Sequence, residues 1–100
     1  MERIEENAKI VILLIEDLIN KESNQVIKMS LNELKNYHIT ILNIIINEWN
    51  CNKALNLMEK IKEWRTVKLN NYLIKTEEGN KIIESIMKLK LSLTKYVYCC

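Results

Sequence analysis

Residues 57–73, LMEKIKEWRTVKLNNYL, and residues 76–89, TEEGNKIIESIMKL, decide the fold of this 100-residue chain. In both segments apolar side chains recur every three or four residues, which is the spacing of one face of an α-helix. The only glycine of the chain, Gly79, marks a break between them. The two segments therefore predict two helices of a small bundle, and they do not by themselves say what the bundle does.

The composition of the whole chain extends this prediction. There is no proline, and a β-sandwich or a nucleotide-binding α/β fold needs glycine and proline in frequent turns. With 48% apolar residues the chain can bury one core, and its length is that of one domain. We therefore expect an all-α fold in a single domain over residues 1–100. It would be a four-helix bundle of long antiparallel helices over about residues 2–93, with a short strand-like tail over residues 94–100.

Helical periodicity places the first helix at about residues 2–20. Ile12, Leu13 and Leu14 widen its apolar face well beyond one stripe, so we expect neighbours to enclose this helix on more than one side. Residues 20–29 are rich in turn-forming polar side chains and break the pattern. They predict a connection that is anchored against the core by a few apolar residues.

Capping residues place the second helix at residues 30–49, because Ser30 and Glu33 have the spacing of a capping box. Either Asn50 or Asn52 would then cap the next helix.

The third helix is expected at about residues 53–75, and the fourth is expected to start after the N-cap Thr76. Glu77 and Glu78 follow Thr76, where the helix dipole favours carboxylates. Residues 94–100, TKYVYCC, are aromatic and β-branched, which favours a strand or an extended peptide over a helix.

The charge is unevenly distributed, although the net charge is only +2. Residues 1–50 carry a net charge of −3 and residues 51–100 carry +5. In an antiparallel bundle the two halves would partly neutralise each other, and the alternative is a dedicated surface for a polyanion. The start of the chain lacks a signal-peptide pattern, and no apolar run approaches the ~18 residues of a membrane span. We therefore expect a cytoplasmic protein that does not bind membranes.

Catalytic and metal-binding chemistry is not indicated. The single histidine, His38, and the three cysteines, Cys51, Cys99 and Cys100, lack zinc-site spacing and suggest no disulfide framework. Nothing marks a third group that would orient a nucleophilic pair of Cys51 and His38. One glycine cannot form a phosphate-binding loop. We expect a protein that is not an enzyme and that uses no cofactor or metal.

Basic side chains gather along one flank of the third helix, at Lys60, Lys62, Arg65 and Lys68. This basic ridge is either a solvated face with Trp64 in the core, or a surface that contacts phosphate or carboxylate groups. Trp49 is either a core residue or an interface anchor. The residues that we assign to a candidate interface are Trp49, Trp64, Arg65, Lys68 and Tyr72.

The order of these segments resembles the helical A-domain of GINS subunits, which are replisome scaffold proteins of archaea and eukaryotes. Residues 15–42, IEDLINKESNQVIKMSLNELKNYHITIL, match an apolar first helix, a Glu-containing turn and a short apolar segment before the second helix. Arg65, Lys68 and Leu69 match an R-x-x-K-[IL] pattern, and residues 76–89 match the fourth helix. The Leu-Pro of that family before the second helix is replaced by Met29-Ser30.

This resemblance implies a non-catalytic subunit that packs against sister subunits and bridges the MCM helicase and a RecJ-like partner in DNA replication. The breadth of the first two helices fits burial against another chain. The alternative is a stand-alone homodimeric adaptor, of viral or plasmid type, that contacts nucleic acid through the basic ridge. Binding to DNA that weakens with salt and on Arg65→Ala or Lys68→Ala would favour the adaptor. An enzyme that uses Cys51, His38 or the Cys99-Cys100 pair is the third alternative.

Overall fold

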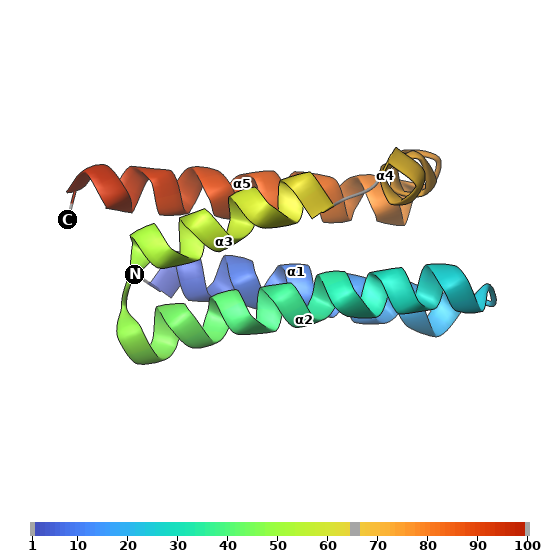
Figure 1. Ribbon diagram of the computed structural model, residues 1–100, viewed down its shortest axis with the longest axis horizontal. Helices are drawn as coiled ribbons and strands as arrows, with labels where there is room; N and C mark the ends of the chain where they lie inside the picture. Colours follow the sequence, from blue (N-terminus) through green and yellow to red (C-terminus); the bar gives the residue numbers. More distant parts are fainter. Residues whose placement is uncertain (1, 65–66, 100) are drawn as a thin grey trace.

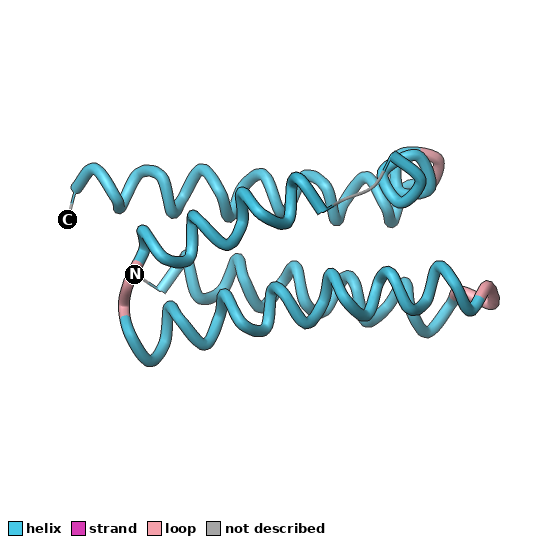
Figure 2. The backbone as a smooth tube through the Cα atoms, viewed as in Figure 1, coloured by secondary structure: helices cyan, strands magenta, loops and turns pink. Residues whose placement is uncertain are grey.

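The computed structural model describes the backbone of residues 2–64 and 67–99 and the side chains of residues 3–60 and 69–95. These residues form helices joined by turns, with no strand among them (Figure 2). The all-α class is therefore confirmed. The helices are α1 (Glu2–Lys21), α2 (Gln25–Glu48), α3 (Cys51–Trp64), α4 (Val67–Ile74) and α5 (Glu77–Cys99).

The four long helices lie side by side in an elongated molecule of 42 × 22 × 20 Å (Figure 1). Each runs antiparallel to the one before it, and α2 and α3 lie in front of α1 and α5 in this view. Helix α1 packs against α2 and α5, and α3 packs against the same two helices. The short α4 crosses the end of this arrangement and packs on α5. In this order α1 and α5 are neighbours, and together they form one of the outer layers of the molecule.

The predicted single helix over residues 53–75 is wrong, because the chain forms α3 and α4 with different directions (Figure 1). Residues 65–66, which join them, lie outside the described residues. Helix α4 buries Leu69 and Leu73, and α3 buries Ala54 and Met58. Because both helices bury residues at helical spacing, the apolar pattern continues from one to the other, and periodicity alone did not reveal the change of direction.

The predicted start of the second helix at Ser30 is also wrong. Helix α2 begins at Gln25, because the Asn24 side-chain oxygen accepts hydrogen bonds from the amides of Val26 and Ile27 at 3.0 and 3.3 Å. Ser30 lies within the helix. The connection between α1 and α2 is therefore residues 22–24, and not residues 20–29 as predicted. Like a capping box, an asparagine cap supplies an acceptor for the amides that have no partner at the start of a helix. Asn24 does this six residues before Ser30, so the helix begins earlier than predicted.

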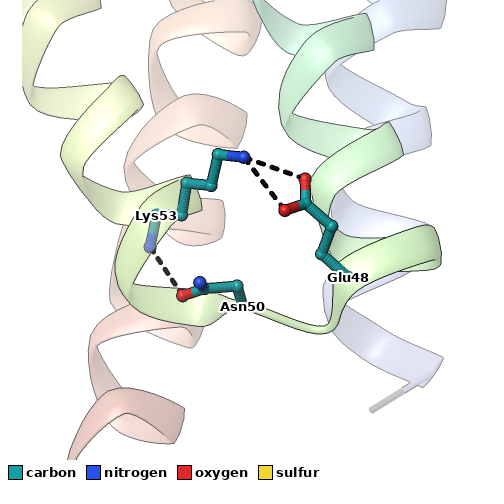
Figure 3. Close-up of polar contacts among 3 residues, drawn as sticks. All are labelled: Glu48, Asn50 and Lys53. Atoms are coloured by element: carbon teal, nitrogen blue, oxygen red, sulfur yellow. Dashed lines mark hydrogen bonds and ion pairs between the residues drawn. The ribbon is translucent and has the colours of Figure 1, made fainter.

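The turn between α2 and α3 resolves the alternative between Asn50 and Asn52. The Asn50 side-chain oxygen accepts a hydrogen bond from the Lys53 amide at 3.0 Å, so Asn50 is the cap of α3 (Figure 3). The Lys53 ammonium donates to both Glu48 carboxylate oxygens, at 2.9 and 3.1 Å, and closes the turn. Helix α2 ends one residue earlier than expected, since Trp49 adopts the left-handed conformation with φ 47°.

The strand-like tail is a wrong prediction for residues 94–99, which continue α5 to Cys99. The Thr94 hydroxyl donates to the Lys90 carbonyl at 2.8 Å, so this β-branched residue is satisfied within the helix. Extending an existing helix costs little, because the costly step is nucleation. The weak strand preference of Thr, Tyr and Val is therefore overridden. Position 100 lies outside the described residues.

The start of α5 agrees with the prediction. The Thr76 hydroxyl accepts a hydrogen bond from the Gly79 amide at 3.0 Å, which makes Thr76 the N-cap. Gly79 is buried, and a Cβ atom there would lie 2.6 Å from the carbonyl carbon of Leu73. The role of Gly79 is therefore close approach between α4 and α5 rather than a helix break.

The core is a single cluster that lies between the four long helices and receives α4 at one end. Its polar members are His38, which is fully buried, and Asn7, which is 9% exposed. His38 Nδ1 lies 2.9 Å from the Leu34 carbonyl oxygen, so that nitrogen is the donor. The Asn7 side-chain amide donates to the Ser92 hydroxyl at 3.2 Å. The largest fully buried apolar side chains are those of Ile4, Ile15, Leu31, Leu34, Ile41, Leu73, Ile82, Leu89 and Leu93.

Candidate functional site

Two of the five candidate interface residues have described side chains, and the structure does not bring them together. Trp49 is partly buried against the core at the turn between α2 and α3. Tyr72 lies on α4, at the opposite end of the molecule (Figure 1). The side chains of Trp64, Arg65 and Lys68 lie outside the described residues. Of the basic ridge, Lys60 is described, and it is exposed.

Tyr72 connects α4 to the turn between α1 and α2. Its hydroxyl donates to Glu22 at 2.6 Å, and the same carboxylate accepts from the amides of Ser23 and Asn24 at 3.1 and 3.3 Å. The hydrogen bond from Tyr72 lowers the pKa of Glu22, and the two amides act in the same direction. Burial, together with the bond to Glu22, raises the pKa of Tyr72 to about 12. This network ties α4 to the turn between α1 and α2.

A pocket of about 510 Å³ opens beside this contact, between the start of α2 and α4. Val26, Ile27, Leu69 and Tyr72 supply its apolar lining, and Asn24, Ser30, Asn71 and Lys75 supply polar groups. It holds no pair of carboxylates and no histidine among those lining residues, so they provide no acid–base pair. Across the described part of the chain, no group of three His, Cys, Asp or Glu side chains is placed to hold a metal ion.

The outer side of α1 carries an apolar surface that the chain itself does not cover. Leu13 is 62% exposed and Ile10 is 46% exposed, while Leu14 is half-buried beside them. With Glu16, Asp17 and Asn20 they line a shallow hollow of about 420 Å³. The prediction that neighbours enclose α1 on more than one side is confirmed by its packing against α2 and α5, but neither helix covers Leu13.

Helix α5 borders this surface. The hydrogen bond from Asn7 to Ser92 fixes which side of α5 faces α1 and the relative level of the two helices. Lys88 and Lys95 lie four residues before and three residues after Ser92, so they share its side of α5, and both are exposed. The outer layer therefore presents an apolar and acidic α1 next to a basic α5. Sequence reasoning indicated burial of the broad apolar face of the first helix against another chain, but it did not single out Ile10 and Leu13 or the neighbouring side of α5.

Comparisons with known protein families, with curated proteins and with solved structures found no match for this chain. None of the helices in the described residues combines the length and the apolar composition that crossing a membrane requires.

Proposed function

We propose that this chain is a non-catalytic helical interaction protein, and that it binds a protein partner through the outer side of α1. The observation that carries this proposal is the exposure of Ile10 and Leu13 side by side, each four residues from a charged residue, Glu6 or Asp17. A patch with apolar residues in the middle and charges at its edge has the anatomy of a protein interface. In the protein that we propose, the four long helices form the bundle expected from the sequence, and α4 packs on α5 at one end of it.

Two kinds of partner remain open for this surface. The resemblance to GINS subunits would make the partner a sister subunit of a replisome scaffold that connects the MCM helicase to other proteins. Two of the segments behind that resemblance differ from expectation, since Val26 to Met29 belong to α2 and the third helix is divided. The second kind of partner is another copy of the chain, as in a homodimeric adaptor. The acidic side chains next to the apolar patch, Glu6 and Asp17, favour the second kind, because α5 of another copy offers exposed lysines.

Site-specific photo-crosslinking in cells that produce the chain tests the proposal. Leu13 is replaced by a photo-reactive phenylalanine analogue, and the matched control carries the same analogue at Asn43, an exposed position of α2. We expect one discrete protein adduct from position 13, none from position 43, and loss of the adduct on Ile10→Glu. Equal adducts from both positions, or no adduct from position 13, would contradict the proposal. Mass spectrometry of the adduct distinguishes a second copy from a different subunit.

A further inference from the structure

We propose that the partner at this surface is a second copy of the same chain, and that α1 of each copy lies on α5 of the other. This inference rests on the proposed function and names its partner. It follows from the match between two rows of exposed side chains and from the register that Asn7 and Ser92 impose on them.

The first row lies on α1 and consists of Glu6, Ile10, Leu13 and Asp17. The intervals of four, three and four residues place them along one line of a helix. All four are exposed, and in the described part of the chain neither Glu6 nor Asp17 forms an ion pair. By contrast, Glu5 and Glu16 of the same helix are neutralised by Lys9 and Lys35. The row therefore has an apolar centre and an uncompensated negative charge at each end.

The second row lies on α5, on the side of the helix that adjoins α1. Its members are exposed and recur at intervals of three and four residues. Three of them are lysines that form no ion pair within the described residues, one is acidic, and one is Leu91, which is 70% exposed. The row consists of Lys81, Glu84, Lys88, Leu91 and Lys95.

The two rows are in register because α1 and α5 are antiparallel and the level of Asn7 is that of Ser92 (Figure 1). Counting along each helix from this contact, Asp17 lies within one residue of the level of Lys81. In the other direction, Glu6 lies within two residues of the level of Lys95. At a rise of ~1.5 Å per residue these offsets are about 1.5 and 3 Å. Each acidic end of the α1 row is thus level with a lysine of the α5 row.

In the proposed dimer, the two copies are related by a two-fold axis parallel to the helices. Such an axis preserves the level of every residue and places α1 of one copy over α5 of the other. Glu6 then faces Lys95 of the partner subunit, and Asp17 faces the partner's Lys81. Ile10 and Leu13 face the partner's Leu91 and the aliphatic stem of the partner's Lys88. The contact is isologous and closed, so it yields a dimer and not a fibre.

Sedimentation of the full chain across protein concentration and salt tests the inference. We expect a dimer of the 11.9 kDa chain whose dissociation constant rises with salt, because the terminal ion pairs are solvent-screened. Leu13→Ala removes apolar area that the second copy buries, and it should raise the dissociation constant by roughly tenfold. Met29→Ala is the matched control, since Met29 is 65% exposed on α2, and it should leave the dissociation constant unchanged.

A charge exchange tests the arrangement itself. Asp17→Lys and Lys81→Asp should each raise the dissociation constant by roughly tenfold, and the double variant should restore it. Failure of the double variant to restore association would overturn the placement of α1 on α5. A monomer at every concentration would overturn the inference as a whole. If the photo-crosslink at position 13 then joins a different protein, only the identity of the partner fails, and the proposed function stands.

Discussion

At the scale of single residues, Gly79 shows how a contact between elements can reverse an intrinsic preference. In an open helix, replacing glycine by alanine stabilises by about 1 kcal/mol. At Gly79 the added methyl group would meet the backbone of Leu73, which cannot rotate away as a side chain can. We expect Gly79→Ala to lower the free energy of unfolding by about 1–3 kcal/mol, the cost of overpacking.

Thermal or urea unfolding at fixed protein concentration measures this effect. Ser85→Ala in the same helix is the control, and it should leave stability unchanged or slightly higher. A Gly79→Ala variant as stable as the wild type would show that α4 does not approach α5 as closely as described.

The hydrogen bond between Tyr72 and Glu22 predicts a pH dependence at the same scale. The folded pKa of Glu22 is lowered from 4.5, so its contribution is present above pH 4.5 and is lost as the pH falls through the folded value. The folded pKa of Tyr72 is raised from 10.0 to about 12, so its contribution is present below pH 10 and is lost as the pH rises toward 12. Tyr72→Phe should therefore be less stable than the wild type between these limits, and the difference should shrink as the pH moves beyond either of them.

Midpoints of thermal unfolding for the wild type and Tyr72→Phe, measured from pH 3 to 12, check this window. In a Glu22→Gln background the destabilisation caused by Tyr72→Phe should lose its dependence on acid pH. A destabilisation that is constant across the whole range would assign the effect of Tyr72 to packing and not to the hydrogen bond.

At the scale of elements, the caps decide where helices begin. Asn24→Ala should lower the stability of the protein by about 1 kcal/mol, because the amides of Val26 and Ile27 lose their acceptor at a helix start. Ser30→Ala is the matched control, since Ser30 lies inside α2 and alanine is the better helix former there. Urea unfolding of both variants measures the two effects. The opposite ranking would place the start of α2 at Ser30.

The local sequence predicted some helix boundaries correctly and others wrongly, for physical reasons. The first helix and the cap at Thr76 follow from periodicity and from one hydroxyl group, and both were predicted from the sequence. The capping box at Ser30 failed because two competing caps lie six residues apart, and local sequence does not rank them. The division into α3 and α4 depends on where Leu69 and Leu73 find their neighbours, which is a property of the whole fold.

At the scale of the whole molecule, the antiparallel order of the helices places an acidic helix beside a basic one. One interpretation of the charge asymmetry between the two halves of the sequence was that they partly neutralise each other in an antiparallel bundle. On the outer layer the neutralisation is incomplete, since Glu6, Asp17, Lys81 and Lys95 form no ion pairs within the described residues. The breadth of the first helix indicated a contact with another chain, but the residues of the candidate site could not be predicted from sequence, because exposure of Leu13 depends on which sides of α1 are covered by α2 and α5.

The central claim is that the outer side of α1 is buried against a second copy of the chain. The most direct measurement is an isotope-filtered NOE experiment on refolded mixtures of ¹³C-labelled and unlabelled chain. The account predicts intermolecular NOEs from the methyl groups of Ile10 and Leu13 to Leu91 and to the Lys88 side chain. Intermolecular NOEs that arise only at other exposed methyl groups, such as those of Met29 or Ile74, would contradict it, as would their complete absence.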